Sequence, residues 1–98
     1  MKPVLSILDP SPLFAGQDAR QALADSLALA DALDGSAWRA IWVQEHHNTQ
    51  SFAGTVPEVL IAALSQRTKH LAIGSGGVML PNYSPLKVAE QFCALAAL

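Results

Sequence analysis

The sequence predicts an α/β protein with a parallel sheet, and three observations support this fold class. Three short apolar segments of strand length alternate with three longer segments that have the apolar spacing of helices. This strand–helix order recurs every ~30–35 residues, as in βαβ units. The strand segments are continuously apolar, which is typical of parallel sheets covered on both faces. No linker, charge block or residue-level repeat divides the chain, so we expect one domain over residues 1–98.

The first unit is predicted to contain a strand over residues 4–8 and a helix that begins near Asp18. Residues 9–12 include two prolines, which have no place inside a sheet and indicate a loop. The helix is indicated by apolar residues at three- and four-residue steps, and Asp34-Gly35 ends it. These apolar residues are Leu23, Leu27, Ala30 and Leu33.

The second unit is predicted to contain a strand over residues 40–43, a polar loop over residues 45–54 and a helix that begins near Pro57. Proline suits the first turn of a helix, and Glu58 lies where a carboxylate complements the positive end of the helix dipole. The cations at residues 67–69 predict where this helix ends.

The third unit begins with a strand from Leu71 to Gly74 or Ser75 and ends in a helix after Pro85. Glycines at 74, 76 and 77 remove every Cβ where the strand should end, so a flat ligand can approach the main chain closely. This segment is not a phosphate loop, because it lacks Gly-Lys-Ser/Thr and Met79 occupies the place of the third glycine in the dinucleotide pattern. Ligands of α/β proteins bind at such carboxyl ends of strands.

Composition limits the class of protein and its partners. Hydrophobic residues make up 51% of the chain and charged residues 14%, and the net charge of −2 gives no basic surface for nucleic acid or an anionic membrane. Cys93 is the only cysteine, which excludes an internal disulfide and favours a reducing, cytoplasmic location. We expect Cys93 to be a small apolar helix residue. The chain stops within an apolar helix that has no cap, so we expect a domain truncated at its C-terminus.

The block Glu45-His46-His47-Asn48 directly follows the second predicted strand. Alternation along an extended chain sends the side chains of His46 and His47 to opposite faces. A histidine at this position can act as a general acid or base, or hydrogen-bond a ligand; satisfying loop backbone groups is the structural alternative. A metal site is not expected, because adjacent histidines diverge and neither His-x-His nor His-x-x-x-His is present. One or both of Trp38 and Trp42 are expected to pack as core, with a ring-stacking platform as the alternative.

Two blocks together resemble the bacterial luciferase-like flavin monooxygenases. They are Trp-Val-Gln-Glu-His-His-Asn at residues 42–48 and Gly-Ser-Gly-Gly-Val-Met-Leu-Pro-Asn at residues 74–82, with Pro85 and Ala-Glu-Gln-Phe at residues 89–92 after them. Residues 57–61 match as well. The resemblance implies a (β/α)₈ barrel that binds reduced flavin mononucleotide (FMN) and uses oxygen to oxidise an organic substrate. Such a barrel takes ~250 residues, so this chain corresponds to its first three βα units.

The resemblance also implies roles for individual residues. His46 matches the catalytic histidine that performs acid/base work beside the flavin. The residues matched to cofactor binding are Gly76, Gly77, Met79, Glu45 and His47, with Gly76–Gly77 as a bulged, cis-peptide segment against the flavin ring. The residues that bind the flavin phosphate lie later in the family's chain, so we do not expect this chain alone to bind FMN. Tyr83 departs from the histidine that many relatives have, which affects expected substrate contacts.

We therefore expect the N-terminal part of an FMN-dependent monooxygenase that acts on a small molecule, with the isolated chain inactive. One alternative is a non-catalytic chain that acts through assembly or flavin binding. Another is a deazaflavin-dependent oxidoreductase of the same superfamily, against which the Glu-His-His-Asn block argues. Three strands of a barrel leave two unpaired edges and an apolar face, so we expect a homo-oligomer.

Overall fold

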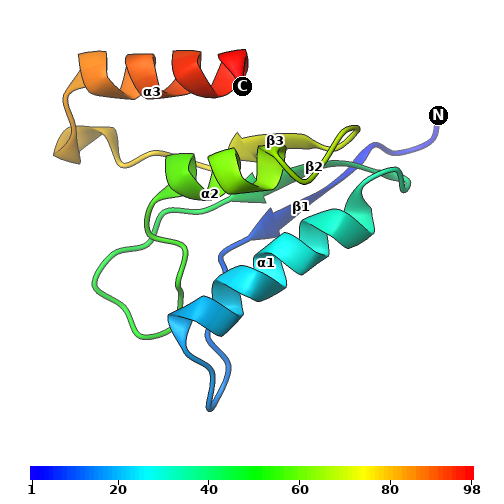
Figure 1. Ribbon diagram of the computed structural model, residues 1–98, viewed down its shortest axis with the longest axis horizontal. Coiled ribbons are helices and arrows are strands. Elements are labelled where there is room, and N and C mark those ends of the chain that lie inside the picture. Colours follow the sequence, from blue (N-terminus) through cyan, green and yellow to red (C-terminus); the bar gives the residue numbers. More distant parts are fainter.

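The strands form one parallel sheet, as predicted. The computed structural model describes residues 1–98, with strands β1 (Leu5–Asp9), β2 (Trp38–Val43) and β3 (Ala72–Ser75) in the order β1-β2-β3. Both strand pairs are parallel, and their register aligns Leu8 with Trp42 and Trp42 with Gly74. A helix follows each strand, so the chain consists of three successive βα units (Figure 1).

The helices are α1 (Ala19–Leu33), α2 (Pro57–Ser65) and α3 (Pro85–Ala97). Helix α1 begins with a capping box in which Asp18 and Gln21 exchange side-chain-to-backbone hydrogen bonds, which satisfies two backbone N–H groups at the helix start. Helix α2 ends at Ser65, shortly before the cations at residues 67–69 that were predicted to mark its end. A short 3₁₀ helix, η1 (Leu80–Asn82), was not predicted; it lies between β3 and α3.

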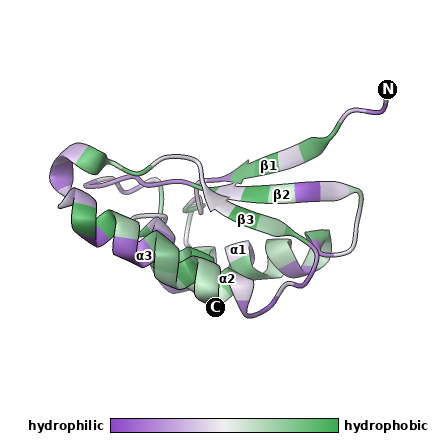
Figure 2. Cartoon of the chain, turned by 90° about the horizontal axis from the view of Figure 1, so that it is seen from above, coloured by the Kyte–Doolittle hydropathy of each residue, from purple (hydrophilic) through white to green (hydrophobic).

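The core lies between the sheet and the pair α1 and α2. Helices cover one face of the sheet and leave the other face bare (Figure 2). Ile41 and Val43 of β2 point into the covered face and are fully buried. The core contains eight buried residues: Ala30, Leu33, Ile41, Val43, Leu60, Ile61, Leu64 and Leu71. The predicted apolar faces of the first two helices therefore form the core with the sheet.

The bare face of the sheet carries Leu8 and Trp42, whose exposed fractions are 55% and 41%. A Cβ on Gly74 would lie 2.7 Å from Cε3 of Trp42, so the tryptophan ring occupies the space that this glycine leaves. Trp42 is thus not a core residue, whereas Trp38 packs against the core as predicted. In a closed barrel this bare face would be the interior, where side chains of alternate strands pack in layers.

Helix α3 packs against α2. None of its residues is buried, although Phe92 and Leu95 contact the core and Gln91 donates a hydrogen bond to Glu58 at 3.2 Å. Cys93 lies on this helix as predicted, but its side chain is exposed instead of packed. No helix has both the length and the apolar character needed to span a membrane.

Candidate functional site at the carboxyl ends of β2 and β3

After β2 ends at Val43, the side chains of the Glu-His-His block form two hydrogen-bonded pairs. The side chain of His46 hydrogen-bonds that of Gln44, and His47 Nε2 lies 2.8 Å from Glu45 Oε1. Residues two apart in an extended chain point to the same side, so the two pairs lie on opposite sides. This arrangement agrees with the predicted separation of His46 and His47. Asn48, directly after the block, has a positive φ of 52°.

His46 is half-buried and held from three directions. Its ring stacks on Phe52 with a centroid distance of 4.7 Å, and its backbone N–H donates to the Gly54 carbonyl at 2.8 Å. The Gln44 side-chain oxygen can only accept a hydrogen bond, so Nε2 of His46 is the donor. In the neutral ring Nδ1 then carries the lone pair and can accept a proton.

Glycine at position 54 lets the loop after β2 fold back onto the strand ends. A Cβ there would lie 2.8 Å from the Pro10 carbonyl oxygen and 3.2 Å from that of Gln44. Both neighbours are backbone atoms that cannot move aside easily. Gly54 therefore allows the close approach that places Phe52 beside His46.

Glu45 is the most connected side chain of the site. Its side chain is 2% exposed, and its carboxylate accepts hydrogen bonds from His47 Nε2, from the Tyr83 hydroxyl and, at 2.6 Å, from the backbone N–H of Met79. Burial alone would raise the pKa of Glu45, but the bonds from Tyr83, Met79 and His47 outweigh it and hold this pKa below its ordinary value. The same bond to Glu45, with burial and the nearby negative charges, raises the pKa of Tyr83 to about 12. The carboxylate is therefore charged and the phenol protonated at neutral pH.

The glycine segment leaves β3 in a bend. Gly76 N–H donates to the Val43 carbonyl at 2.7 Å, and the Ser75 hydroxyl donates to the Gly77 carbonyl at 2.6 Å. Every peptide bond is trans, so the cis form expected at Gly76–Gly77 is wrong for this chain. A Cβ on Gly77 would meet no atom within 4 Å, whereas one on Gly76 would lie 2.9 Å from the Leu8 side chain. Of the three glycines whose main chain was expected to be accessible to a ligand, only Gly77 therefore has open space beside it.

A cleft of about 220 Å³ separates the end of β2 from the segment after β3. Seven residues line it: Gln44, Glu45, His46, Gly76, Gly77, Val78 and Met79. Five of the six residues singled out from the sequence thus line one cleft, and the sixth, His47, lies behind Glu45 as its hydrogen-bond partner. The contacts of Gln44, Phe52 and Gly54 were not predicted from the sequence, in which Tyr83 stands out only as a departure from relatives. Gln44 stands beside Glu45 in the block at residues 42–48, but no local pattern links Phe52, Gly54 or Tyr83 to the cleft.

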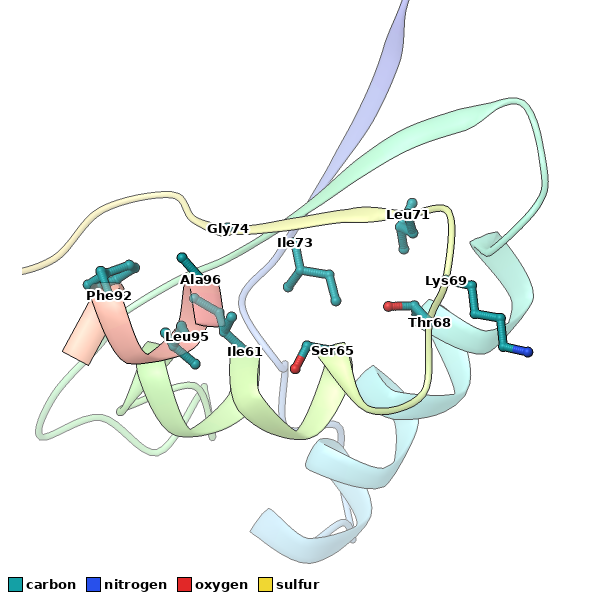
Figure 3. Close-up of a pocket in the computed structure, with 10 residues that line it drawn as sticks. All are labelled: Ile61, Ser65, Thr68, Lys69, Leu71, Ile73, Gly74, Phe92, Leu95 and Ala96. Atoms are coloured by element: carbon teal, nitrogen blue, oxygen red, sulfur yellow. The ribbon is translucent and has the colours of Figure 1, made fainter. Parts of the chain in front are cut away.

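A second cavity of about 350 Å³ lies on the helix side of β3, among side chains of α2, α3 and the turn between α2 and β3 (Figure 3). Its lining is mostly apolar. The hydroxyls of Ser65 and Thr68 there donate to the backbone carbonyls of Ala62 and Leu64. This cavity contains no carboxylate or histidine, so the chemistry-bearing residues define the smaller cleft as the candidate site. No group of three His, Cys, Asp or Glu side chains is placed to hold a metal ion.

Three βα units with a cleft at the carboxyl ends of their strands define part of an α/β-barrel protein. The sequence from residue 4 to residue 98 matches the family of luciferase-like monooxygenases. The chain belongs to this family. It is 45% identical to the N-acetyl-S-alkylcysteine monooxygenase of Bacillus subtilis over 94 residues, and 45% identical to a luciferase-like monooxygenase of Escherichia coli over 93 residues.

Two solved structures have the same fold. The crystal structure of apo-MsnO8 superposes with a TM-score of 0.93 at 40% identity. The oxygenating constituent of 3,6-diketocamphane monooxygenase from Pseudomonas putida, a type II Baeyer–Villiger monooxygenase solved in complex with FMN, superposes with a TM-score of 0.85 at 24% identity. The matches cover 96% of this chain in both structures, but 28% and 26% of those chains. The chain likewise spans 28% of the length of the Bacillus subtilis and Escherichia coli relatives, and corresponds to the first three βα units of a (β/α)₈ barrel.

Proposed function

We propose that this chain is the N-terminal part of an FMN-dependent monooxygenase, in which reduced flavin and oxygen oxidise a small organic molecule and the full barrel is required for activity. The observation that carries the proposal is the cleft, which brings together the histidine and the glycines that the family resemblance assigns to catalysis and flavin binding. The cleft lies at the carboxyl ends of β2 and β3, where barrel enzymes bind their ligands.

The cleft fits a flat ring on one side. Gly77 presents backbone without a neighbouring atom, and the Ser75 hydroxyl holds this backbone in place. Gly77 and Met79 would pack against a flavin, which when bound would supply the electrons for oxygen chemistry. This chain contributes one wall of such a site, because the cleft is open to solvent.

His46 is the proposed proton-transfer group. Its hydrogen bond to Gln44 selects the tautomer, and stacking on Phe52 restricts rotation of the ring. A ring fixed in this way can accept a proton at Nδ1 without reorganising. His47 differs from His46 because it does not line the cleft, and its Nε2 is engaged by the carboxylate of Glu45.

Flavin titration of two proteins tests the proposal. We expect the chain of 98 residues to bind FMN weakly or not at all, because holding the ring without its phosphate forgoes charge-assisted hydrogen bonds. A chimera, in which residues 4–98 replace the matching segment of the Bacillus subtilis N-acetyl-S-alkylcysteine monooxygenase, should bind FMN and oxidise that enzyme's substrate. A folded chimera that binds no flavin would refute the function. Preference of the chimera for a deazaflavin would support the deazaflavin-dependent alternative.

We also propose that the isolated chain self-associates. β1 and β3 each have an unpaired edge, and the bare sheet face exposes Leu8 and Trp42. Exposed strand edges and contiguous apolar surface favour pairing with another chain. Light scattering should report an oligomer at micromolar concentration. A stable monomer with native circular dichroism would contradict this proposal.

A further inference from the structure

The two ends of the cleft are joined by side chains that are far apart in the sequence. Glu45 and His47 follow β2, whereas Met79 and Tyr83 follow β3. Met79 and Tyr83 both donate hydrogen bonds to the Glu45 carboxylate, and the Tyr83 hydroxyl also lies within hydrogen-bond distance of His47, which itself bonds Glu45. Oε2 of Glu45 accepts from Met79 N–H at 2.6 Å, and Oε1 accepts from the Tyr83 hydroxyl and from His47. The carboxylate is thus occupied on both oxygens.

We propose that Glu45 is a positioning residue. Its carboxylate and the hydrogen bonds from Met79 and Tyr83 form a latch, which holds these two residues to the end of β2 and so sets the width of the cleft. In this role Glu45 does not contact the flavin itself. This inference goes beyond the flavin-binding role expected from the resemblance, and its flavin part rests on the proposed function. The geometry carries it, because the side chain is 2% exposed and three donors already occupy most of the acceptor positions of its carboxylate.

The hydrogen bonds of the latch are charge-assisted, because the Glu45 carboxylate that accepts them is ionised. Hydrogen bonds to an ionised acceptor are roughly twice as strong as neutral ones. Replacing Glu45 with glutamine keeps the size but places an amide NH₂ against one of the three donors. A buried donor that loses its acceptor carries the full cost of desolvation. The segment from Gly77 to Met79 should then move away from β2.

Titration of Tyr83 tests the latch in the chain itself. Tyr83 is the only tyrosine, so the near-ultraviolet absorbance of phenolate reports this residue alone. We expect a pKa of about 12 in the unmodified chain and a value closer to 10.0 in Glu45→Gln. Glu58 of α2 also raises this pKa and remains in the variant, as does His47. The matched control is Glu90→Gln, the same change at an exposed glutamate of α3, which should leave the titration unchanged. An unmodified chain that titrates at 10.0 with its circular dichroism intact would overturn the latch.

A double-mutant cycle in the chimera separates positioning from direct contact, and it also decides the matter if the isolated chain unfolds before the phenol ionises. Glu45→Gln should raise the Kd for FMN about tenfold, and Tyr83→Phe several-fold. The double variant should be no worse than Glu45→Gln alone, because Tyr83 acts through Glu45. Positioning would be refuted if the two substitutions raised the Kd for FMN independently, so that their factors multiplied in the double variant. An unchanged Kd in Glu45→Gln would refute it as well. Loss of flavin binding in the unmodified chimera would refute the proposed function, while the tyrosine titration still tests the latch.

Discussion

The two ends of the sheet are each held by one carboxylate that accepts three hydrogen bonds, but the donors differ. At the amino end, Asp34 accepts from the backbone N–H groups of Lys69, His70 and Leu71 at 2.8–2.9 Å. At the carboxyl end, Glu45 accepts from one backbone N–H and from the side chains of Tyr83 and His47. Backbone donors do not ionise or change rotamer, whereas both side-chain donors can. The amino end is therefore built as a fixed scaffold and the carboxyl end as an adjustable site.

This contrast agrees with the division of labour in barrel proteins, in which the carboxyl face carries the chemistry and the amino face contributes stability. Asp34 joins the turn after α1 to the turn after α2, and the Arg67–Asp31 ion pair joins α1 to that second turn. None of these groups faces the cleft. The amino end can therefore be perturbed without touching the candidate site.

The largest expected effect is on turnover. In the chimera, His46→Ala should reduce the turnover number about 10²–10⁴-fold, the usual contribution of a positioned acid/base group, and leave the unfolding midpoint nearly unchanged. His70→Ala, at the opposite end of the sheet, is the matched control and should retain activity. His47→Ala should lose less than His46→Ala. Equal losses from the two cleft histidines, or unfolding of His46→Ala, would assign His46 a structural role.

A smaller effect separates two glycines at the end of β3. Gly74→Ala forces a Cβ against the Trp42 ring, and overpacking of this kind costs about 1–3 kcal/mol of the free energy of unfolding. Gly77→Ala meets no atom within 4 Å and should change that free energy by less than about 0.5 kcal/mol. Denaturant unfolding measures both. In the chimera, Gly77→Ala should nevertheless weaken FMN binding, and similar stability losses at the two positions would contradict this account.

The smallest effect concerns pH and Asp34. Hydrogen bonds from the backbone N–H groups of Lys69, His70 and Leu71 hold the pKa of Asp34 below its ordinary value. Burial acts in the opposite direction but does not outweigh them. A depressed pKa means that the stabilisation is present above the ordinary range of aspartate and is lost as the pH falls through the folded-state pKa. Asp34→Asn should therefore lower the thermal midpoint near neutral pH and lower it by less in acid.

Melting curves followed by circular dichroism across this pH range check the prediction for Asp34. Glu90→Gln removes one carboxylate from the surface and should show no such trend. A difference between Asp34→Asn and the unmodified chain that stays constant into acid would show that the charge of Asp34 does not contribute.

The sequence by itself determined the order of the elements and the parallel sheet. Apolar strands and amphipathic helices leave periodic signals within each segment, and prolines and glycines mark their ends. The histidine block and the glycine segment were noticed in the same way, because each follows a strand and parallel strands end at one edge. The resemblance to a family then assigned roles to His46, Gly76 and Gly77. Even the separation of His46 from His47 followed from alternation along an extended chain.

Only the tertiary structure decided how those residues are connected. Glu45 and Tyr83 lie 38 residues apart, and Asp34 and Leu71 lie 37 apart, so no local pattern links the members of either pair. The place of the Trp42 ring over Gly74 likewise depends on the neighbouring strand. Hydrogen bonds and close packing between distant segments exist only once the chain has folded, and for that reason the latch on the cleft became visible in the structure and not in the sequence.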